Sequence, residues 1–149
     1  MKIDVKLVTK EFYEEYELPS HSTIHSAGID LRAATFERRT IHPGETTLLP
    51  TGLIFAVPES VVMLLVPRSG LGHKHGIVLG NLVGVIDPDY RGEVMVSVWN
   101  RGAAPYIIEP GERICQALFI PFNTVELNQV AELPDTVRAA GGFGSSGRG

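Results

Sequence analysis

The sequence contains one cysteine and no long apolar run. Cys115 cannot form an internal disulfide, and the CxxC spacings that hold zinc are absent. No apolar run approaches the roughly 20 residues that a membrane span needs. Residues 1–12 also lack the apolar stretch of a secretory signal. These absences lead us to expect a cytoplasmic protein that has no membrane partner.

An excess of basic residues is also missing. The 13 Lys and Arg residues are outnumbered by 17 Asp and Glu residues, which gives a net charge of -4. A general nucleic-acid binder carries a basic surface, so we expect no nucleic-acid partner. A small anionic ligand remains compatible with this charge, because local cations, backbone N–H groups and a metal can hold it.

Signals for long helices are scarce. The chain has 149 residues, enough for one domain, and its 16 glycines and 10 prolines interrupt it every few positions. Residues 9–16 are expected to form a loop or a single turn. Strand patterns are frequent, which predicts an all-β sandwich or barrel. Residues 2–7 alternate like a half-buried strand, and the apolar run 61–66 suggests a strand buried on both faces. The other expected strands are 46–49, 52–57, 93–99, 106–108 and 114–121.

The end of the chain differs in kind from the rest. Residues 141–149 (GGFGSSGRG) hold one large side chain, Phe143. Such a segment cannot bury enough apolar surface to fold alone. It is either a disordered end or a flap that becomes ordered over a ligand.

Two stretches could bind an anion or a metal. Residues 67–72 (PRSGLG) supply a guanidinium, a hydroxyl and glycines that let backbone N–H groups approach a phosphate, although a structural turn explains them equally well. Asp30 lies in an apolar, strand-like run, where a carboxylate needs a partner. That partner is either an arginine, such as Arg32 or Arg68, or a metal.

Three further features remain open on the residues alone. His73 and His75 could chelate a metal from a strand, but without a third ligand we expect them in a solvated loop. Cys115 lies in an apolar strand pattern and is expected in the core. Residues 87–92 (DPDYRG) form a polar turn between two strand patterns. Either this turn is only a hairpin tip, or one of its carboxylates is catalytic.

Five motifs together make the chain resemble the homotrimeric dUTPase family. They are AGIDLRAA (27–34), PRSGLGHKHG (67–76), GVIDPDYRGEV (84–94), PGERICQALF (110–119) and GGFGSSG (141–147), in the family's order. The resemblance implies a β jelly-roll homotrimer with three shared active sites. It also implies Mg²⁺-dependent hydrolysis of dUTP to dUMP and pyrophosphate, which limits uracil in DNA and supplies dUMP for thymidylate synthesis.

The resemblance assigns a role to each matched position. Asp87 corresponds to the general base that activates the attacking water, Tyr90 to the ring that packs under deoxyribose, and Asp30 to the acid that reaches magnesium through water. The other matched positions contact substrate: Arg68, Ser69 and Gly70 at the phosphates, Asn81, Gly84, Val85, Ile86 and Met95 on the uracil hairpin, Gln116 near the phosphates, Arg138 at the γ-phosphate and Phe143 over uracil.

The resemblance also sets domain limits and alternatives. We expect a jelly-roll domain over residues 1–137 and a flexible flap over residues 138–149. A dCTP deaminase of the same fold is one alternative, and a non-catalytic trimer that binds nucleotide is another. The matched hairpin and the glycine-rich tail around Phe143 favour hydrolysis. A positioned carboxylate such as Asp87 makes water a better nucleophile, which is the chemistry that hydrolysis needs.

Overall fold

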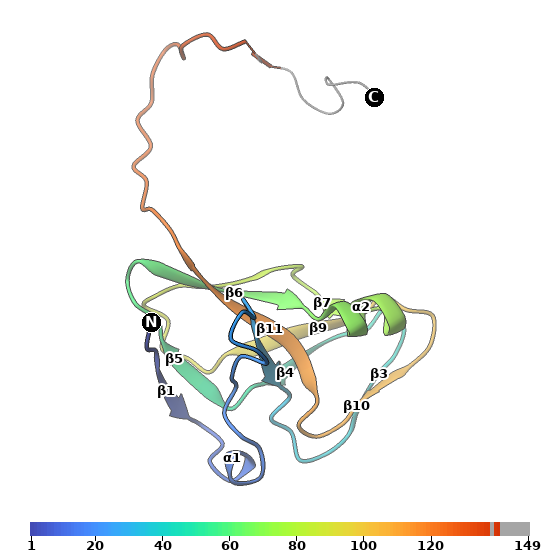
Figure 1. Ribbon diagram of the computed structural model, residues 1–149. Helices are drawn as coiled ribbons and strands as arrows, with labels where there is room; N and C mark the ends of the chain where they lie inside the picture. Colours follow the sequence, from blue (N-terminus) through green and yellow to red (C-terminus); the bar gives the residue numbers. More distant parts are fainter. Residues whose placement is uncertain (138, 141–149) are drawn as a thin grey trace.

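The strand pattern of the sequence produces eleven strands and two short helices in the described part of the chain (Figure 1). The computed structural model describes residues 1–137, 139 and 140. The strands are β1 Asp4–Leu7, β2 Ile29–Arg32, β3 Arg39–Ile41, β4 Thr46–Pro50, β5 Leu53–Ala56, β6 Val61–Pro67, β7 Ile77–Leu79, β8 Gly84–Ile86, β9 Met95–Asn100, β10 Tyr106–Ile108 and β11 Arg113–Pro121. The helices are α1 Phe12–Glu15 and α2 Ser69–His75. The predicted all-β class is confirmed.

The strands pair antiparallel in four small sheets that wrap around one core. The largest sheet has the order β2-β11-β6-β8, and a second has the order β4-β9-β7. Two-stranded pairs, β1-β5 and β10-β3, complete the wrapping. This is a single-domain β jelly roll, in which strands distant in sequence become neighbours.

The longest ladder joins β11 to β6, and it decides which side chains share a face. Gln116 lies opposite Val66, and Leu118 lies opposite Leu64. On the other side of β11, Gln116 lies opposite Asp30 of β2. Because side chains alternate along a strand, these residues all project from the outer face of the sheet.

The expectation that residues 61–66 are buried on both faces is wrong for the single chain. The inner side chains Val61, Met63 and Leu65 are at most 3% exposed, whereas those between them are only partly covered. Val85, opposite Leu64 on β8, is 60% exposed. The apolar sequence therefore provides a core face and also an outer face that the described residues leave partly exposed. The expected half-burial of residues 2–7 is confirmed for Ile3 and Leu7, which pack partly buried against the core, whereas Val5 between them is 37% exposed.

The core lies between the inner faces of the sheets, and the two buried polar residues described there, Thr51 and Asn100, are hydrogen-bonded. Asn100 is fully buried at the end of β9. Its Nδ2 donates to the carbonyls of Ile41 and Ala104, each at 2.9 Å, and its Oδ1 accepts from the Gly102 N–H. This pairing offsets the desolvation of the amide and fixes the turn into β10.

The expectation from the sequence is confirmed for one of the two helices and wrong for the other. Residues 12–15 form the single turn α1, anchored by buried Phe12. Residues 69–75, expected as a turn and a solvated loop, instead form α2. The two glycines suggested a loop, but buried Leu71 packs the segment against the core. His73 and His75 therefore lie on a helix, where i, i+2 side chains do not face each other.

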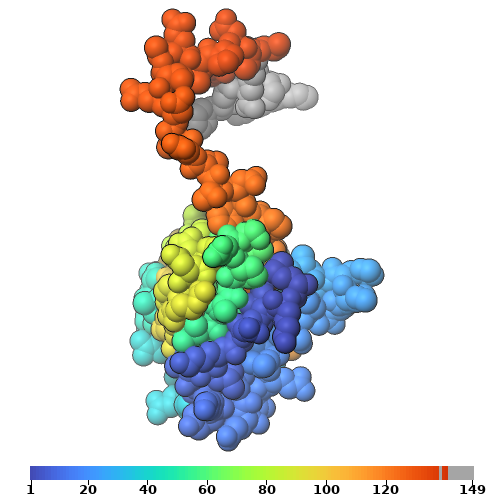
Figure 2. Space-filling view, turned by 90° about the vertical axis from the view of Figure 1, so that its left-hand side faces the viewer, coloured from blue at the N-terminus to red at the C-terminus, as the bar shows by residue number. Residues whose placement is uncertain are grey.

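The chain leaves the compact body after β11. Figures 1 and 2 show the described residues beyond Phe122 extending away from the strands. Several apolar side chains there are exposed, including Val125 at 79% and Leu127 at 93%. Among the described residues, no helix is both long and apolar enough to cross a bilayer.

Candidate active site

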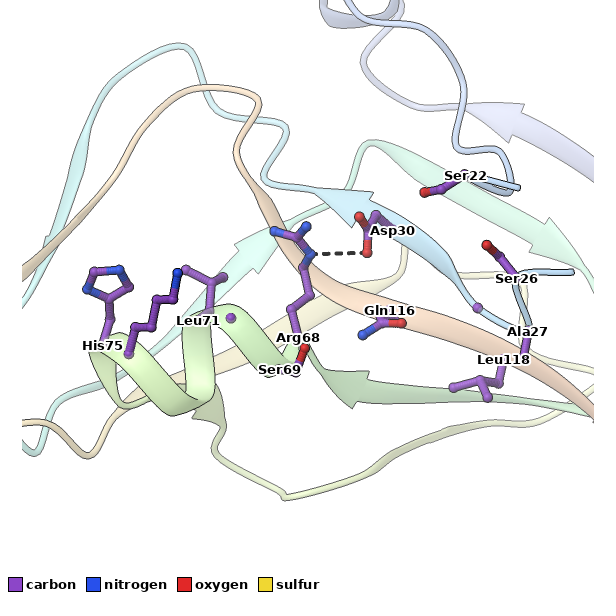
Figure 3. Close-up of a pocket in the computed structure, with 13 residues that line it drawn as sticks. Ser22, Ser26, Ala27, Asp30, Arg68, Ser69, Leu71, His75, Gln116 and Leu118 are labelled. Atoms are coloured by element: carbon purple, nitrogen blue, oxygen red, sulfur yellow. Dashed lines mark hydrogen bonds and ion pairs between the residues drawn. The ribbon is translucent and has the colours of Figure 1, made fainter. Parts of the chain in front are cut away.

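A cavity of about 630 Å³ opens on the outer face of the large sheet, beside α2 (Figure 3). It combines residues of the two strands β2 and β11, Arg68 and helix α2 that follow β6, and the loop before β2. The lining residues are Ser22, Ser26, Ala27, Gly28, Asp30, Arg68, Ser69, Gly70, Leu71, Lys74, His75, Gln116 and Leu118. The cations and hydroxyls in this set suit an anionic ligand.

Asp30 holds two arginines at the edge of this cavity. Its Oδ1 accepts from the Arg68 Nε at 3.1 Å, and its Oδ2 lies 3.6 Å from Arg113 Nη1. Arg68 also donates through Nη1 to the Arg113 carbonyl at 3.1 Å. The proposed arginine partner of Asp30 is therefore Arg68 and not Arg32, which donates to the Gly111 carbonyl at 2.8 Å.

Gln116 lies beside Asp30 on the same face, where Gly28 leaves room for it. A Cβ added at Gly28 would lie 3.0 Å from Gln116 Oε1. The Gln116 Nε2 is 3.4 Å from the Pro67 carbonyl, a long contact. The amide is therefore positioned by packing, and its hydrogen-bonding capacity is largely available to a ligand.

Cys115 lies directly behind this group, on the inner face of β11. It is fully buried, which confirms the expected core role. Burial raises the pKa of its thiol to about 12, the negative charge of Asp30 adds to this, and Arg68 partly opposes it. Because the thiolate is the reactive form, this thiol is not a nucleophile in the folded protein.

The polar turn at residues 87–92 is the tip of the hairpin that joins β8 to β9, and this hairpin carries a second group of predicted site residues. Asp87 is exposed, and its carbonyl accepts from the Tyr90 N–H at 3.1 Å. Tyr90 Oη donates to the Glu93 carbonyl at 3.0 Å. Arg91 folds back onto the carbonyls of Pro88 and Tyr90. The turn is thus closed by its own polar groups, and the Asp87 carboxylate faces solvent.

A strained turn precedes β8. Leu82 has a φ of 63°, and the Val83 N–H donates to the Asn81 carbonyl at 2.7 Å across it. A hydrogen bond across one residue of positive φ defines a tight γ-turn that is unfavourable for a leucine. Such strain gathers at functional sites because the surrounding structure must maintain it.

The two groups lie at opposite ends of β6. Arg68 follows the last residue of β6, whereas β8 runs antiparallel and places Ile86 opposite Met63. Asp87 therefore lies near the start of β6. About six strand residues separate the position of Asp87, near the start of β6, from Arg68 at its end, and this corresponds to about 20 Å. A single copy of the chain does not bring Asp87 to the cavity that contains Arg68.

The structure brings together one part of the predicted site and separates the other. Asp30, Arg68, Ser69, Gly70 and Gln116 line one cavity, whereas the residues of the β8–β9 hairpin do not contribute to it. The hairpin group comprises Asn81, Gly84, Val85, Ile86, Asp87, Tyr90 and Met95. Arg138 and Phe143 lie outside the described residues.

Sequence reasoning missed several cavity residues. Arg113, which lies beside the cavity, belongs to the motif at residues 110–119 but was given no role there, and its strand register with β2 places it near Asp30. Lys74 and His75 were expected in a solvated loop, yet both line the cavity because α2 turns them towards it. Ser22 and Ser26 come from an irregular loop, and Figure 3 shows them at the end of the cavity away from His75. Had residues 69–75 been predicted as a helix, Lys74 could have been recognised as a residue that lines the cavity.

A divalent metal fits this cavity only together with a substrate. No three His, Cys, Asp or Glu side chains of the described residues cluster as a metal cage. Asp30, already paired with two guanidinium groups, is poorly suited to bind a metal directly. It retains lone pairs for a metal-bound water, and magnesium commonly takes most of its ligands from phosphate oxygens and water.

Comparison with known proteins identifies the family. The family model described as dUTPase matches residues 14–147. The chain belongs to the dUTPase family. Its relatives include the deoxyuridine 5'-triphosphate nucleotidohydrolases of Klebsiella pneumoniae (strain 342), 54% identical over 148 residues, and of Escherichia coli O9:H4 (strain HS), 52% identical over 148 residues. The alignments cover 99% of this chain and 97% and 98% of those proteins.

Solved structures of dUTPases share the fold. The dUTPase of Staphylococcus bacteriophage 80alpha with dUpNHpp superposes with a TM-score of 0.86 at 29% identity, covering 98% of both chains. A mutant dUTPase from phage phi11 of S. aureus, described with a structural Mg(II) ion, superposes at 0.77 with 25% identity, covering 89% of this chain and 98% of that one. The chain described here is thus a hydrolase built on a β jelly roll.

Proposed function

We propose that the chain hydrolyses dUTP to dUMP and pyrophosphate by attack of a water molecule on the α-phosphate. One observation carries the proposal. The residues matched to the dUTPase motifs form a cationic cavity and an exposed carboxylate on a rigid hairpin, the two parts that a nucleotide hydrolase needs. The reaction limits uracil in DNA and supplies dUMP for thymidylate synthesis.

The cavity binds the phosphate groups. Arg68 presents a guanidinium whose Nε and Nη1 are already held by Asp30 and the Arg113 carbonyl. A guanidinium fixed in this way loses little conformational freedom when it binds an anion. Ser69, Gly70 and Gln116 add a hydroxyl, a backbone N–H and an amide, and Lys74 adds a second cation.

The hairpin binds the nucleoside and supplies the base. Asp87 accepts a proton from the water as the water attacks the α-phosphorus, so the nucleophile forms at neutral pH. Backbone groups of Gly84, Val85 and Ile86, with Asn81 and Met95, bind the uracil. Tyr90 packs under the deoxyribose. A narrow pocket of fixed polar groups rejects bases with a different hydrogen-bonding edge.

The end of the chain completes the site in this proposal. Residues 138–149 form a flap beyond the jelly-roll domain of residues 1–137, Arg138 binds the γ-phosphate and Phe143 covers the uracil. Closing such a flap excludes water from the reacting groups. Magnesium bound with the triphosphate would offset part of its negative charge, and Asp30 would accept a hydrogen bond from a metal-bound water.

The working enzyme is a homotrimer with shared sites. The separation of about 20 Å along β6 between the positions of Asp87 and Arg68 supports this proposal, in which a second copy supplies one of the two groups. The outer sheet face next to the cavity supports this assembly, since it carries partly exposed Leu64 and Leu118 and the exposed Val85. Apolar faces of this kind occur where protein chains associate.

Release of pyrophosphate from dUTP tests the proposal. The wild-type protein should release pyrophosphate with magnesium and lose this activity when EDTA removes the metal. Asp87→Asn should still bind dUTP, because it keeps the shape of the hairpin, but its turnover should fall at least a hundredfold. Turnover near the wild-type rate would refute the base assignment. Ammonia release from dCTP would instead indicate a deaminase, and nucleotide binding without any product would indicate a non-catalytic trimer.

A further inference from the structure

The base of the catalytic hairpin is tied to the bend between β4 and β5. The Val94 carbonyl accepts from Thr51 Oγ1 at 2.7 Å and from the Thr51 N–H at 3.2 Å. The Val94 N–H in turn donates to the Leu53 carbonyl at 2.9 Å. Thr51 is fully buried, so this end of the hairpin is fixed to the core.

Glu93 provides the next connection. Its Oε1 accepts from the Gly52 N–H at 2.7 Å. Gly52 is buried between β4 and β5 and belongs to neither strand ladder, so its N–H has no partner in either. An unpaired buried N–H costs the full desolvation of the group. The carboxylate of Glu93 therefore satisfies a donor that the fold would otherwise leave unpaired.

The bend cannot easily adjust to the loss of this contact. Gly52 has a φ of +68°, and a Cβ there would lie 3.1 Å from the Tyr13 ring and 3.2 Å from Ala34. Tyr13 Oη donates to the Thr51 carbonyl at 2.6 Å, which fixes the same bend from the other side. Gly52 is thus held in one position, and so is the carboxylate bound to it.

The same residue also holds Tyr90. The Glu93 carbonyl accepts from Tyr90 Oη at 3.0 Å. The Tyr90 ring lies so close to Gly92 that an added Cβ there would be only 3.0 Å from Tyr90 Cε2. Through its side chain Glu93 contacts the core, and through its backbone it contacts the exposed ring.

We infer that Glu93 is a positioning residue that holds Tyr90 in place and thereby sets the preference for deoxyribose over ribose. This inference rests on the proposed function, in which Tyr90 packs under the sugar. A wall can exclude one added hydroxyl only if it does not move to admit it. Glu93 itself acts through the ring and does not contact the substrate.

The test compares three variants on two substrates. Glu93→Ala removes the acceptor, Glu93→Met removes it while keeping the length of the side chain, and Glu93→Gln keeps an acceptor oxygen. Values of kcat/KM are measured for dUTP and UTP. We expect the dUTP:UTP ratio to fall about tenfold in the Ala and Met variants, the effect of losing one hydrogen bond of this kind, and to stay near the wild-type ratio in Glu93→Gln.

Glu45→Ala is the matched control. Glu45 Oε2 accepts from the His42 N–H at 2.8 Å, a carboxylate–amide contact outside both groups of site residues. This variant should keep the wild-type ratio. If Glu93→Ala and Glu93→Met lose thermal stability but keep the ratio, Glu93 is only structural and the inference is wrong. If Glu93→Ala does not fold, the comparison of Glu93→Met with Glu93→Gln decides. A wild-type protein that does not hydrolyse dUTP would refute the proposed function instead.

Discussion

The Asp30 carboxylate and the Arg68 guanidinium face each other at 3.1 Å at the edge of the cavity beside α2. The two residues are 38 positions apart in sequence, and they meet because β11 lies between β2 and β6. Asp30 therefore has a role before any substrate arrives. It fixes the direction of the arginine that is proposed to bind the phosphates.

Asp30→Asn should weaken this arrangement without changing its shape. We expect kcat/KM for dUTP to fall at least tenfold, because an ionised partner makes a stronger hydrogen bond to a guanidinium than a neutral amide does. The measurement is steady-state hydrolysis at several magnesium concentrations. Glu109→Gln is the control, since Glu109 pairs with exposed Arg38 at 2.9 Å away from the cavity. Equal losses in the two variants would show that Asp30 has no special role.

The sequence indicated the strands well because their signals are local. Alternating apolar residues and turn-forming Gly and Pro predict β4, β6, β9 and β11 to within a few residues. The helix α2 was missed because Gly70 and Gly72 suggest a loop, whereas burial of Leu71 depends on contacts with distant residues. Tertiary packing overrode the local preference.

The sequence predicted which residues belong to the site, but it did not predict which of them lie together. The motifs pointed to Asp30, Arg68 and Gln116, but their meeting depends on strand pairing that no local pattern encodes. The role of Arg113 follows from the same register. The outer face of β6 looked like core because a sequence does not distinguish an apolar side chain that packs inside the chain from one that stays partly exposed on its surface.

The backbone strain at Leu82 should lower the free energy of unfolding by a measurable amount. Its φ of 63° is unfavourable for a residue with a Cβ, and its side chain is 67% exposed, so truncation removes little packing. We therefore expect Leu82→Gly to unfold with a free energy about 1 kcal/mol higher than that of Leu82→Ala. Urea denaturation of the two variants gives the difference directly. A more stable alanine variant would show that the γ-turn stores no strain.

The Cys115 thiol should be inert until the protein unfolds. Burial raises its pKa from 9.0 to about 12, so the folded state favours the protonated thiol. Its contribution to stability is complete below pH 9.0 and is lost as the pH rises towards about 12. A thiol reagent should modify the native protein at the rate of unfolding, and Cys115→Ala should show a smaller loss of stability over that pH range than the wild type. Rapid modification of the folded protein would contradict the burial.

Mixing two inactive variants should restore activity if the sites are shared. Asp87→Asn disables the hairpin and Arg68→Ala disables the cavity, and about 20 Å of β6 separates the two positions in one chain. After the chains are unfolded and refolded together, some sites will combine an intact Asp87 from one copy with an intact Arg68 from another. Random mixing in a closed trimer predicts about a quarter of the wild-type activity.

The control for this experiment uses two lesions in the same hairpin. A mixture of Asp87→Asn and Tyr90→Ala should show no more than the mean activity of the two separate variants, because every hairpin then carries one damaged residue regardless of which copy adjoins it. Recovery in the first mixture and none in the second requires that the hairpin and the cavity of one site come from different chains. If neither mixture recovers while native mass spectrometry shows that the Asp87→Asn and Arg68→Ala chains have formed mixed trimers, both groups of each site come from one chain. The strand register of β6 and β8 would then have to change on assembly.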